Sequence, residues 1–199
     1  GCVVVTHRLG SVLWDEETGF TAGAFLLAMP YLLTQVPAML VDVPTMAFLA
    51  LATLAAAQAF RSGGAGRVLV ASLAVSLALF AKYSAGLLLS VLPVIAVVSR
   101  REGAPRPWRT AIATALVPAS LVLAAALARP DVLRDQWALL AGYQAPGLRR
   151  WGESWASTFL FQVHPFVTAA ALLSAWVAAR RRDARWAVVL WPVSLLLVL

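Results

Sequence analysis

The sequence predicts an all-α, polytopic membrane protein that crosses the bilayer about seven times. Of its 199 residues, 61% are hydrophobic and only 13% are charged, whereas soluble proteins average about 45–50% apolar and about 25% charged residues. The apolar residues come in blocks close to the length that crosses about 30 Å of hydrocarbon. Arginines cluster between these blocks, so the net charge of +7 is typical of cytoplasmic loops and not of a nucleic-acid-binding protein.

The predicted membrane helices follow one another closely along the chain. After an apolar stub at 1–6, they cover residues 19–35, 43–60, 67–81, 84–98, 110–128, 157–179 and 186–199. Both ends of the sequence lie inside apolar runs without a signal-peptide pattern, so we expect a fragment truncated at both ends. Residues 1–199 are predicted to form one partial transmembrane domain. It has an outer loop at about 129–156 and no separate soluble domain.

A nearly continuous apolar stretch at residues 67–98 is predicted to form a hairpin of two short helices. A single straight helix of this length would extend about 48 Å, well beyond the hydrocarbon thickness. It would also hold Lys82 near the middle of the membrane, where a charge is costly, whereas a hairpin places Lys82 at a membrane surface. Pro37 and Pro44 divide residues 19–60 in a similar way, because proline inside a helix removes a hydrogen bond and clashes with the preceding turn.

The charges between the predicted helices give a consistent topology. Four segments are predicted to lie inside: His7–Thr18 and the loops at 61–67, 99–109 and 180–185. They hold eleven of the sixteen basic residues, namely Arg8, Arg61, Arg67, Arg100, Arg101, Arg106, Arg109, Arg180, Arg181, Arg182 and Arg185. Because short cytoplasmic loops collect Lys and Arg, this distribution favours a multi-pass protein of the plasma (inner) membrane. Asp42, Lys82 and the 129–156 loop are then predicted to face the periplasm or the cell exterior.

Asp42 lies within the apolar run AMLVDVPTMAF, and two roles fit it. Aspartate is a favoured N-cap, and Pro44 is tolerated in a first helical turn, so both residues suit the start of a membrane helix. An outward carboxylate at this place also suits a general base, a metal ligand or a group that binds a hydroxyl. The two roles are compatible, and Asp42 is a candidate for a supporting acid in a reaction site.

Five further residues are candidates for binding a substrate or a lipid phosphate on the outer side. Lys82 and Tyr83 form the tip of the predicted hairpin, although Lys and Tyr are also common interfacial anchors. Arg149 and Arg150 stand between apolar and tryptophan-rich segments; their guanidinium groups match phosphate oxygens, and a plain interfacial belt explains them equally well. His164 lies about two turns inside a predicted span, where a polar side chain usually faces a cavity or a partner helix.

Other polar residues indicate structure. Asp15, Glu16 and Glu17 are predicted to cap or precede the helix at 19–35. Cys2 is the single cysteine, so the chain can form no intrachain disulfide and no cysteine-based metal site. No cluster of His, Asp and Glu has metal-ligand spacing, so we assign no metal ligands and no cofactor, and the sequence does not identify a divalent cation.

Two segments carry a resemblance to a known family: GAFLLAMPYLLTQVPAMLVDVPTMAFLALATLAA and SLALFAKYSAGLLLSVLPVIAVVSRR. They resemble the central membrane region of GT-C glycosyltransferases. The nearest branch is the bacterial family 39 group, which is similar to protein O-mannosyltransferases and to the aminoarabinose transferase of lipid A. The resemblance covers roughly residues 1–105, with an Asp-x-Pro before a span and a Lys-Tyr type hairpin tip. Farther on, only His164 and Pro165 resemble the family's outward His-Pro segment.

The resemblance implies an inverting transfer of a sugar from a polyprenyl-phosphate donor to a lipid, glycan or protein acceptor on the outer face. Asp42 matches the family's second outward acidic position. The principal catalytic acid of the family lies in an earlier outer loop, so we expect this fragment alone to be inactive. The alternatives are a polytopic transporter or lipid flippase, suggested by the layout and by His164, and a structural membrane subunit. Charges gathered at the predicted surfaces disfavour the transporter.

Overall fold

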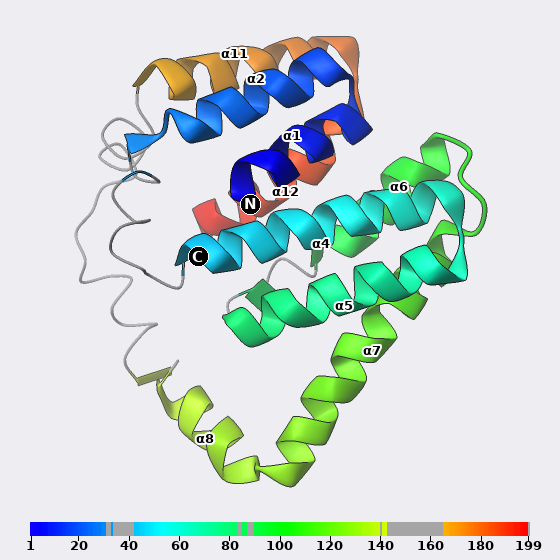
Figure 1. Ribbon diagram of the computed structural model, residues 1–199, viewed down its shortest axis with the longest axis vertical. Helices are drawn as coiled ribbons and strands as arrows, with labels where there is room; N and C mark the ends of the chain where they lie inside the picture. Colours follow the sequence, from blue (N-terminus) through cyan, green and yellow to red (C-terminus); the bar gives the residue numbers. More distant parts are fainter. Residues whose placement is uncertain are drawn as a thin grey trace.

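The computed structural model is all-helical over the residues that it describes, which are 1–30, 33, 42–82, 85–86, 90–139, 141–142 and 165–198. The helices are α1 (Cys2–Leu13), α2 (Glu16–Leu27), α4 (Asp42–Ser62), α5 (Ala65–Ala81), α6 (Val91–Arg101), α7 (Pro107–Ala128), α8 (Pro130–Leu139), α11 (Pro165–Arg181) and α12 (Trp186–Val198). Figure 1 shows α1, α4, α5, α6 and α12 gathered in one bundle, with α2 and α11 on one side of it. The first half of α7 packs against α5 and α6, and its second half runs away from the bundle and leads to α8 (Figure 1).

Two of the described helical segments are long and apolar enough to cross a membrane: Val43–Ser62 in α4 and Pro107–Ala128 in α7. They coincide closely with two of the predicted spans. The remaining predicted spans correspond to shorter described helices, such as the 17-residue α5 and the 11-residue α6. Helix α8 forms within the segment predicted as an outer loop, and Arg129 and Asp131 form an exposed ion pair of 2.8 Å at its start.

The predicted break at Lys82 is confirmed. Helix α5 ends at Ala81, Lys82 has an extended backbone with φ −158° and ψ 126°, and the next long helix begins at Val91. The described part of α4 runs from Asp42, which agrees with the predicted start of a helix at the Asp-Val-Pro sequence. Proline in the first turn of a helix costs no hydrogen bond, which is why Pro44 is accommodated there.

The predicted end of the first helix near residue 6 is wrong, because most of the segment His7–Thr18 is helical. Helix α1 continues past the predicted stub to Leu13, and the connection to α2 is formed by Trp14 and Asp15 alone. The Asp15 carboxylate accepts a hydrogen bond of 2.8 Å from the Thr18 amide, which confirms the predicted cap at the start of α2.

A close contact between glycines holds α1 against α2. A Cβ added at Gly10 would lie 2.6 Å from the Gly19 Cα, and one added at Gly19 would collide with the His7 carbonyl and the Ser11 hydroxyl. Near the connection, His7 Nε2 lies 2.9 Å from Glu16 Oε1. The missing side chains allow the two helix backbones to approach closely, and this contact extends α1 through a segment that charge alone marks as a loop.

Small residues also set the packing of the bundle. Helices α4 and α5 meet through buried alanines, including Ala55, Ala59 and Ala74. A second cluster joins α4, α6 and α12 around the fully buried ring of Phe60, together with Ile95 and Val188. The second cluster contains larger side chains, so small residues set the close approach of α4 and α5, and larger side chains fill the space between α4, α6 and α12.

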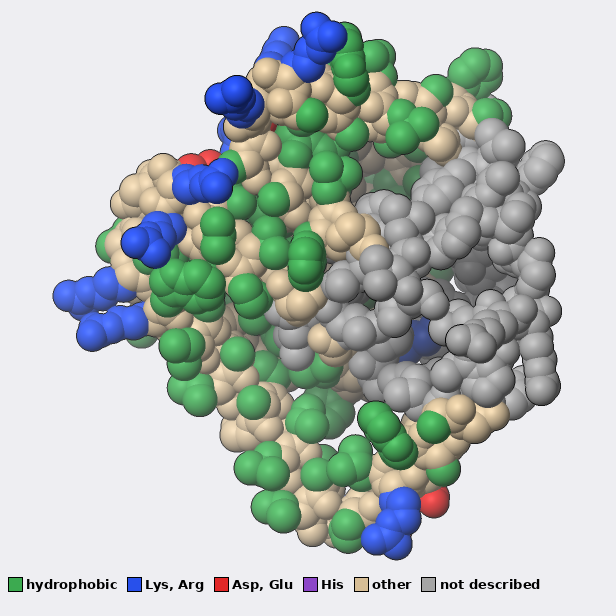
Figure 2. Space-filling model, turned by 180° about the vertical axis from the view of Figure 1, so that it is seen from behind, with side chains coloured by type: hydrophobic (Ala, Val, Ile, Leu, Met, Phe, Trp, Pro, Cys, Tyr) green, Lys and Arg blue, Asp and Glu red, His purple; other side chains and the backbone are tan. Residues whose placement is uncertain are grey.

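The connections α1–α2, α4–α5, α6–α7 and α11–α12 lie at the same end of the molecule, on the right of Figure 1. Three of them turn through backbone with positive φ, at Gly63 and Gly103 and at Arg182. Pro105 in the α6–α7 connection lies against Gly63 in the α4–α5 connection. Seen from behind, most of the visible Lys and Arg side chains group along this edge, and hydrophobic side chains cover much of the remaining described surface (Figure 2). We call this edge the basic end.

Replacing Gly19 by alanine is expected to destabilise the protein. The new methyl group would collide with the backbone of α1, and overpacking of this kind costs about 1–3 kcal/mol. Thermal unfolding of the purified chain, followed by tryptophan fluorescence, measures the effect. The control is Gly66→Ala in α5, where an added Cβ meets nothing within 4 Å and alanine favours the helix. A Gly19→Ala protein as stable as the Gly66→Ala protein would show that the glycine contact does not hold α1 to α2.

Candidate functional site

The α4–α5 hairpin places Asp42 and Lys82 at the end of the bundle opposite the basic end (Figure 1). Helix α4 runs for 21 residues from Asp42, and α5 returns over 17 residues to Ala81. At 1.5 Å per residue these lengths separate both positions from the α4–α5 turn by about 25–30 Å. The predicted separation of these two residues from the arginine-rich connections is therefore present in the fold.

Lys82 is partly buried and directly follows the last residue of α5. Its amide donates a hydrogen bond of 3.2 Å to the Ala78 carbonyl, and its own carbonyl accepts one of 2.9 Å from the Ala85 amide. These bonds to both sides hold the backbone at Lys82 between α5 and the short turn that contains Ala85. The backbone of Asp42 is described as the first residue of α4, and its side chain lies outside the described part.

An apolar cavity of about 500 Å³ lies between α1, α4, α5, α6 and α12. Its wall includes Met46 from α4 and Ala78 from α5, together with Val91 and Val188. Met46 comes one helical turn after Asp42, and Ala78 comes one turn before Lys82, so the cavity reaches within about one turn of both candidate residues. Among the described residues of the wall the one polar side chain is Thr53, whose hydroxyl donates to the Leu49 carbonyl at 2.9 Å. The cavity therefore suits a hydrocarbon.

The other predicted site residues are Tyr83, Arg149, Arg150 and His164, and they lie outside the described residues. The structure thus brings Asp42 and Lys82 to one end and leaves the remaining four as predictions. Among the described residues, no three His, Cys, Asp or Glu side chains come together in a group that could hold a metal ion.

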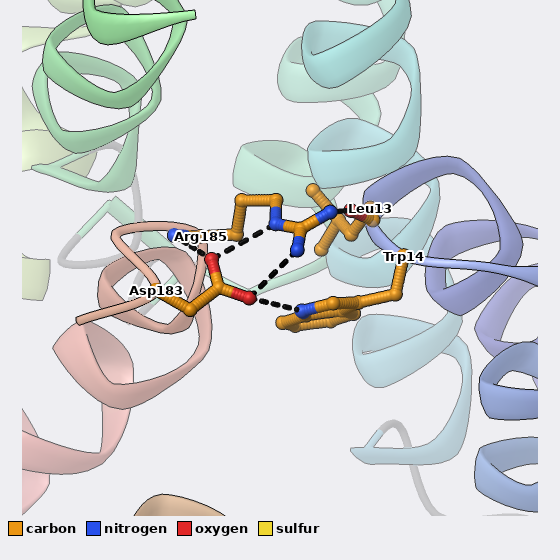
Figure 3. Close-up of polar contacts among 4 residues, drawn as sticks. All are labelled: Leu13, Trp14, Asp183 and Arg185. Atoms are coloured by element: carbon orange, nitrogen blue, oxygen red, sulfur yellow. Dashed lines mark hydrogen bonds and ion pairs between the residues drawn. The ribbon is translucent and has the colours of Figure 1, made fainter. Parts of the chain in front are cut away.

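A polar network at the basic end joins the α1–α2 connection to the α11–α12 connection (Figure 3). The Asp183 carboxylate accepts hydrogen bonds from the Trp14 indole at 3.0 Å and from Arg185 Nε and Nη2 at 2.9 and 2.8 Å. Arg185 also donates from Nη1 to the Leu13 carbonyl at 3.0 Å. We call these four residues the Asp183 network. It ties the last helix of the described chain to the first.

The charge of Asp183 is stabilised mainly by Arg185. Hydrogen bonds from the Arg185 side chain, followed by that from its amide and that from Trp14, lower the pKa of Asp183 from 3.8 to about 2, although partial burial opposes the shift. The same contact raises the pKa of Arg185. Trp14 also packs against Trp186, with ring centroids 5.7 Å apart. The network is therefore ionised at neutral pH and fixes the α11–α12 connection in place.

Reasoning from the sequence did not identify the Asp183 network. Trp14 and Asp183 are 169 residues apart, and each stands in a short charged segment that has an ordinary explanation as a loop. The one feature of the sequence that points to this network is a single acidic residue, Asp183, among four arginines at 180–185. That signal indicates a local ion pair but does not identify the tryptophan that completes the network.

Comparison of this chain with models of known protein families, with curated proteins and with solved structures finds no match.

The Asp183 network is expected to make stability depend on pH. The pKa of Asp183 is lower in the folded than in the unfolded protein, so its contribution is present above about pH 4 and is lost as the pH falls towards 2. A shift from 3.8 to about 2, reduced for solvent screening, corresponds to about 1–2 kcal/mol. Unfolding followed between pH 6 and 2 is therefore expected to show a flatter dependence for Asp183→Asn than for the unmodified chain.

The control is Asp135→Asn, which removes an exposed carboxylate from α8. It is expected to keep the pH dependence of the unmodified protein. If both variants had the same dependence as the unmodified chain, the pairing of Asp183 with Arg185 and Trp14 would contribute nothing to stability.

Proposed function

We propose that the chain is a polytopic protein of the plasma (inner) membrane, with about seven spans and with its basic end in the cytoplasm. Two helices, α4 and α7, are long and apolar enough to cross a membrane, which supports this proposal. On α7, Leu116, Leu123 and Leu127 are also 61%, 59% and 75% exposed. Such leucines are stable against lipid but costly in water. The collection of arginines at one end agrees with the positive-inside rule.

We further propose that the protein takes part in moving a sugar from a polyprenyl-phosphate donor to an acceptor at the outer face. The observation that carries this proposal is the apolar cavity, which reaches within one helical turn of Asp42 and Lys82 at the end opposite the basic end. A polyprenyl chain in this cavity would hold its phosphate near Lys82. The similarity of the sequence around Asp42 and Lys82 to GT-C glycosyltransferases points to the same chemistry.

In this proposal the acceptor hydroxyl attacks the anomeric carbon of the donor sugar and inverts it. The bond from that carbon to the phosphate oxygen breaks, and polyprenyl phosphate leaves with the electron pair. A carboxylate takes the proton of the hydroxyl. Asp42 supports that step as a second acidic group, and Lys82 offsets the charge that develops on the phosphate.

The remaining candidates complete the outer site. Arg149, Arg150, Tyr83 and His164 are proposed to contact the phosphate or the sugar. A lipid flippase would use the same cavity but would form no glycosidic bond, and assays that follow the bond distinguish the two functions.

The membrane placement predicts opposite accessibility for two positions. Starting from a Cys2→Ser protein, single cysteines are introduced as Lys82→Cys and Gly64→Cys, the latter at a turn where an added Cβ meets nothing within 4 Å. In spheroplasts, a membrane-impermeant maleimide is expected to label position 82, and to label position 64 only after permeabilisation. The Cys2→Ser protein is the control for background. Labelling of both positions from the same side would exclude the proposed topology.

The site assignment predicts that Asp42→Asn lowers transferase activity of the complete gene product by about tenfold or more, because a carboxylate near the reacting hydroxyl is lost. The assay follows transfer of labelled sugar from polyprenyl phosphate in isolated membranes. Lys82→Gln is expected to lose more activity than Lys82→Arg, which keeps the positive charge. Asp135→Asn on α8, distant from α4 in Figure 1, is the matched control and is expected to keep full activity. Full activity in Asp42→Asn would remove Asp42 from the site.

A further inference from the structure

A second site is indicated at the basic end, where a surface groove of about 360 Å³ lies between the end of α6 and the α11–α12 pair. Its volume is within the range of about 300–1,000 Å³ found for small-molecule sites. Arg101 is the last residue of α6, and Arg182 lies in the connection between α11 and α12. Two cationic side chains from different elements thus line one groove.

The two arginines are available to a ligand. Both are exposed, and within the described part of the chain neither is paired with a carboxylate. Asp183 also lines the groove, but its oxygens are engaged by Arg185 and Trp14. The one carboxylate in the wall is therefore already neutralised, and the groove keeps an excess of positive charge.

The rest of the wall is apolar. Ala175 and Ala179 come from α11, and Ala187 and Leu190 come from α12. Ala175 precedes Arg182 by two helical turns, so the apolar strip extends about 10 Å away from the arginines. Trp186, which the Trp14 ring holds in place, lies between the charged and the apolar parts of the wall. Tryptophan is typical of the level of the headgroups in a membrane.

We propose that this groove binds an anionic phospholipid of the inner leaflet, with its phosphate between Arg101 and Arg182 and an acyl chain along α11 and α12. Guanidinium groups form paired hydrogen bonds with phosphate oxygens. A free phosphate would leave the apolar strip uncovered, and a choline headgroup would bring its own positive charge towards two arginines. The combination of charge and apolar wall therefore favours an anionic amphiphile. The proposal rests on the membrane placement proposed above but not on the transferase activity.

The test measures lipid binding to the full chain purified in detergent. Phosphatidylglycerol is titrated against phosphatidylcholine, binding is followed by native mass spectrometry, and stabilisation is followed by tryptophan fluorescence during thermal unfolding. Phosphatidylglycerol is expected to bind more tightly and to raise Tm more. The double variant Arg101→Gln/Arg182→Gln is expected to weaken phosphatidylglycerol binding by about tenfold or more.

The matched control is Arg61→Gln/Arg67→Gln, which removes the same charge from exposed positions that do not line the groove. It is expected to bind phosphatidylglycerol like the unmodified chain. A second variant, Ala179→Phe, fills the apolar strip at an exposed position without changing charge and is also expected to weaken binding. This variant keeps the test valid if the double arginine variant fails to fold.

Four results would overturn the proposal. Equal weakening in both double variants would indicate diffuse attraction to the whole basic end. Equal binding of the two lipids, or unchanged phosphatidylglycerol binding by Ala179→Phe, would exclude an anionic amphiphile in the groove. Competition by inorganic phosphate at millimolar concentration would identify a site for a free anion. Failure of the membrane placement is a separate result, seen as release of the chain from membranes by alkaline carbonate.

Discussion

The rest of the structure depends on one spatial constraint: short connections join the helices in pairs, and these connections meet at the basic end. The turn after α4 lies beside the connection before α7, and Asp183 joins the turn before α12 to the turn after α1. From the turn at the basic end, α4 and α5 stay together because buried alanines pack between them along their length. The opposite ends of these two helices, at Asp42 and next to Lys82, therefore lie at the same end of the bundle, about 25–30 Å from the turn.

The Asp183 network links distant parts of the chain, because the local Asp183–Arg185 ion pair is hydrogen-bonded to Trp14 and to the Leu13 carbonyl. The strength of the network comes from its geometry. One carboxylate accepts four hydrogen bonds, three of them from Arg185 and one from Trp14. Charge-assisted bonds of this kind are stronger than neutral ones and leave few unsatisfied groups. By holding α12 near α1 and α6, the network also closes one wall of the apolar cavity and one wall of the arginine groove.

The break at Lys82, the start of α4 and the cap at Asp15 could be predicted from the sequence, because each depends on neighbouring residues alone. The break follows from the length of a helix that fits the membrane, the start of α4 from the geometry of proline, and the cap from a backbone amide that needs a hydrogen-bond acceptor. The predictions were wrong or incomplete where the structure depends on contacts between residues far apart in the sequence. Helix α1 continues through Arg8 because Gly10 meets Gly19 across the hairpin, and charge alone marked that segment as a loop. The cavity and the Asp183 network likewise require helices far apart in the sequence, so neither could be predicted from spacing.

The most direct test of the two-ended arrangement is an electron cryomicroscopy structure of the complete gene product in a lipid nanodisc. We expect α4 and α5 to cross the bilayer, with Arg61, Arg101 and Arg182 in one headgroup layer and Asp42 and Lys82 in the other. Density for a lipid tail in the apolar cavity would agree with this placement. An α4–α5 hairpin that lies outside the bilayer, or arginine-rich connections on both faces of the bilayer, would rule out this two-ended arrangement.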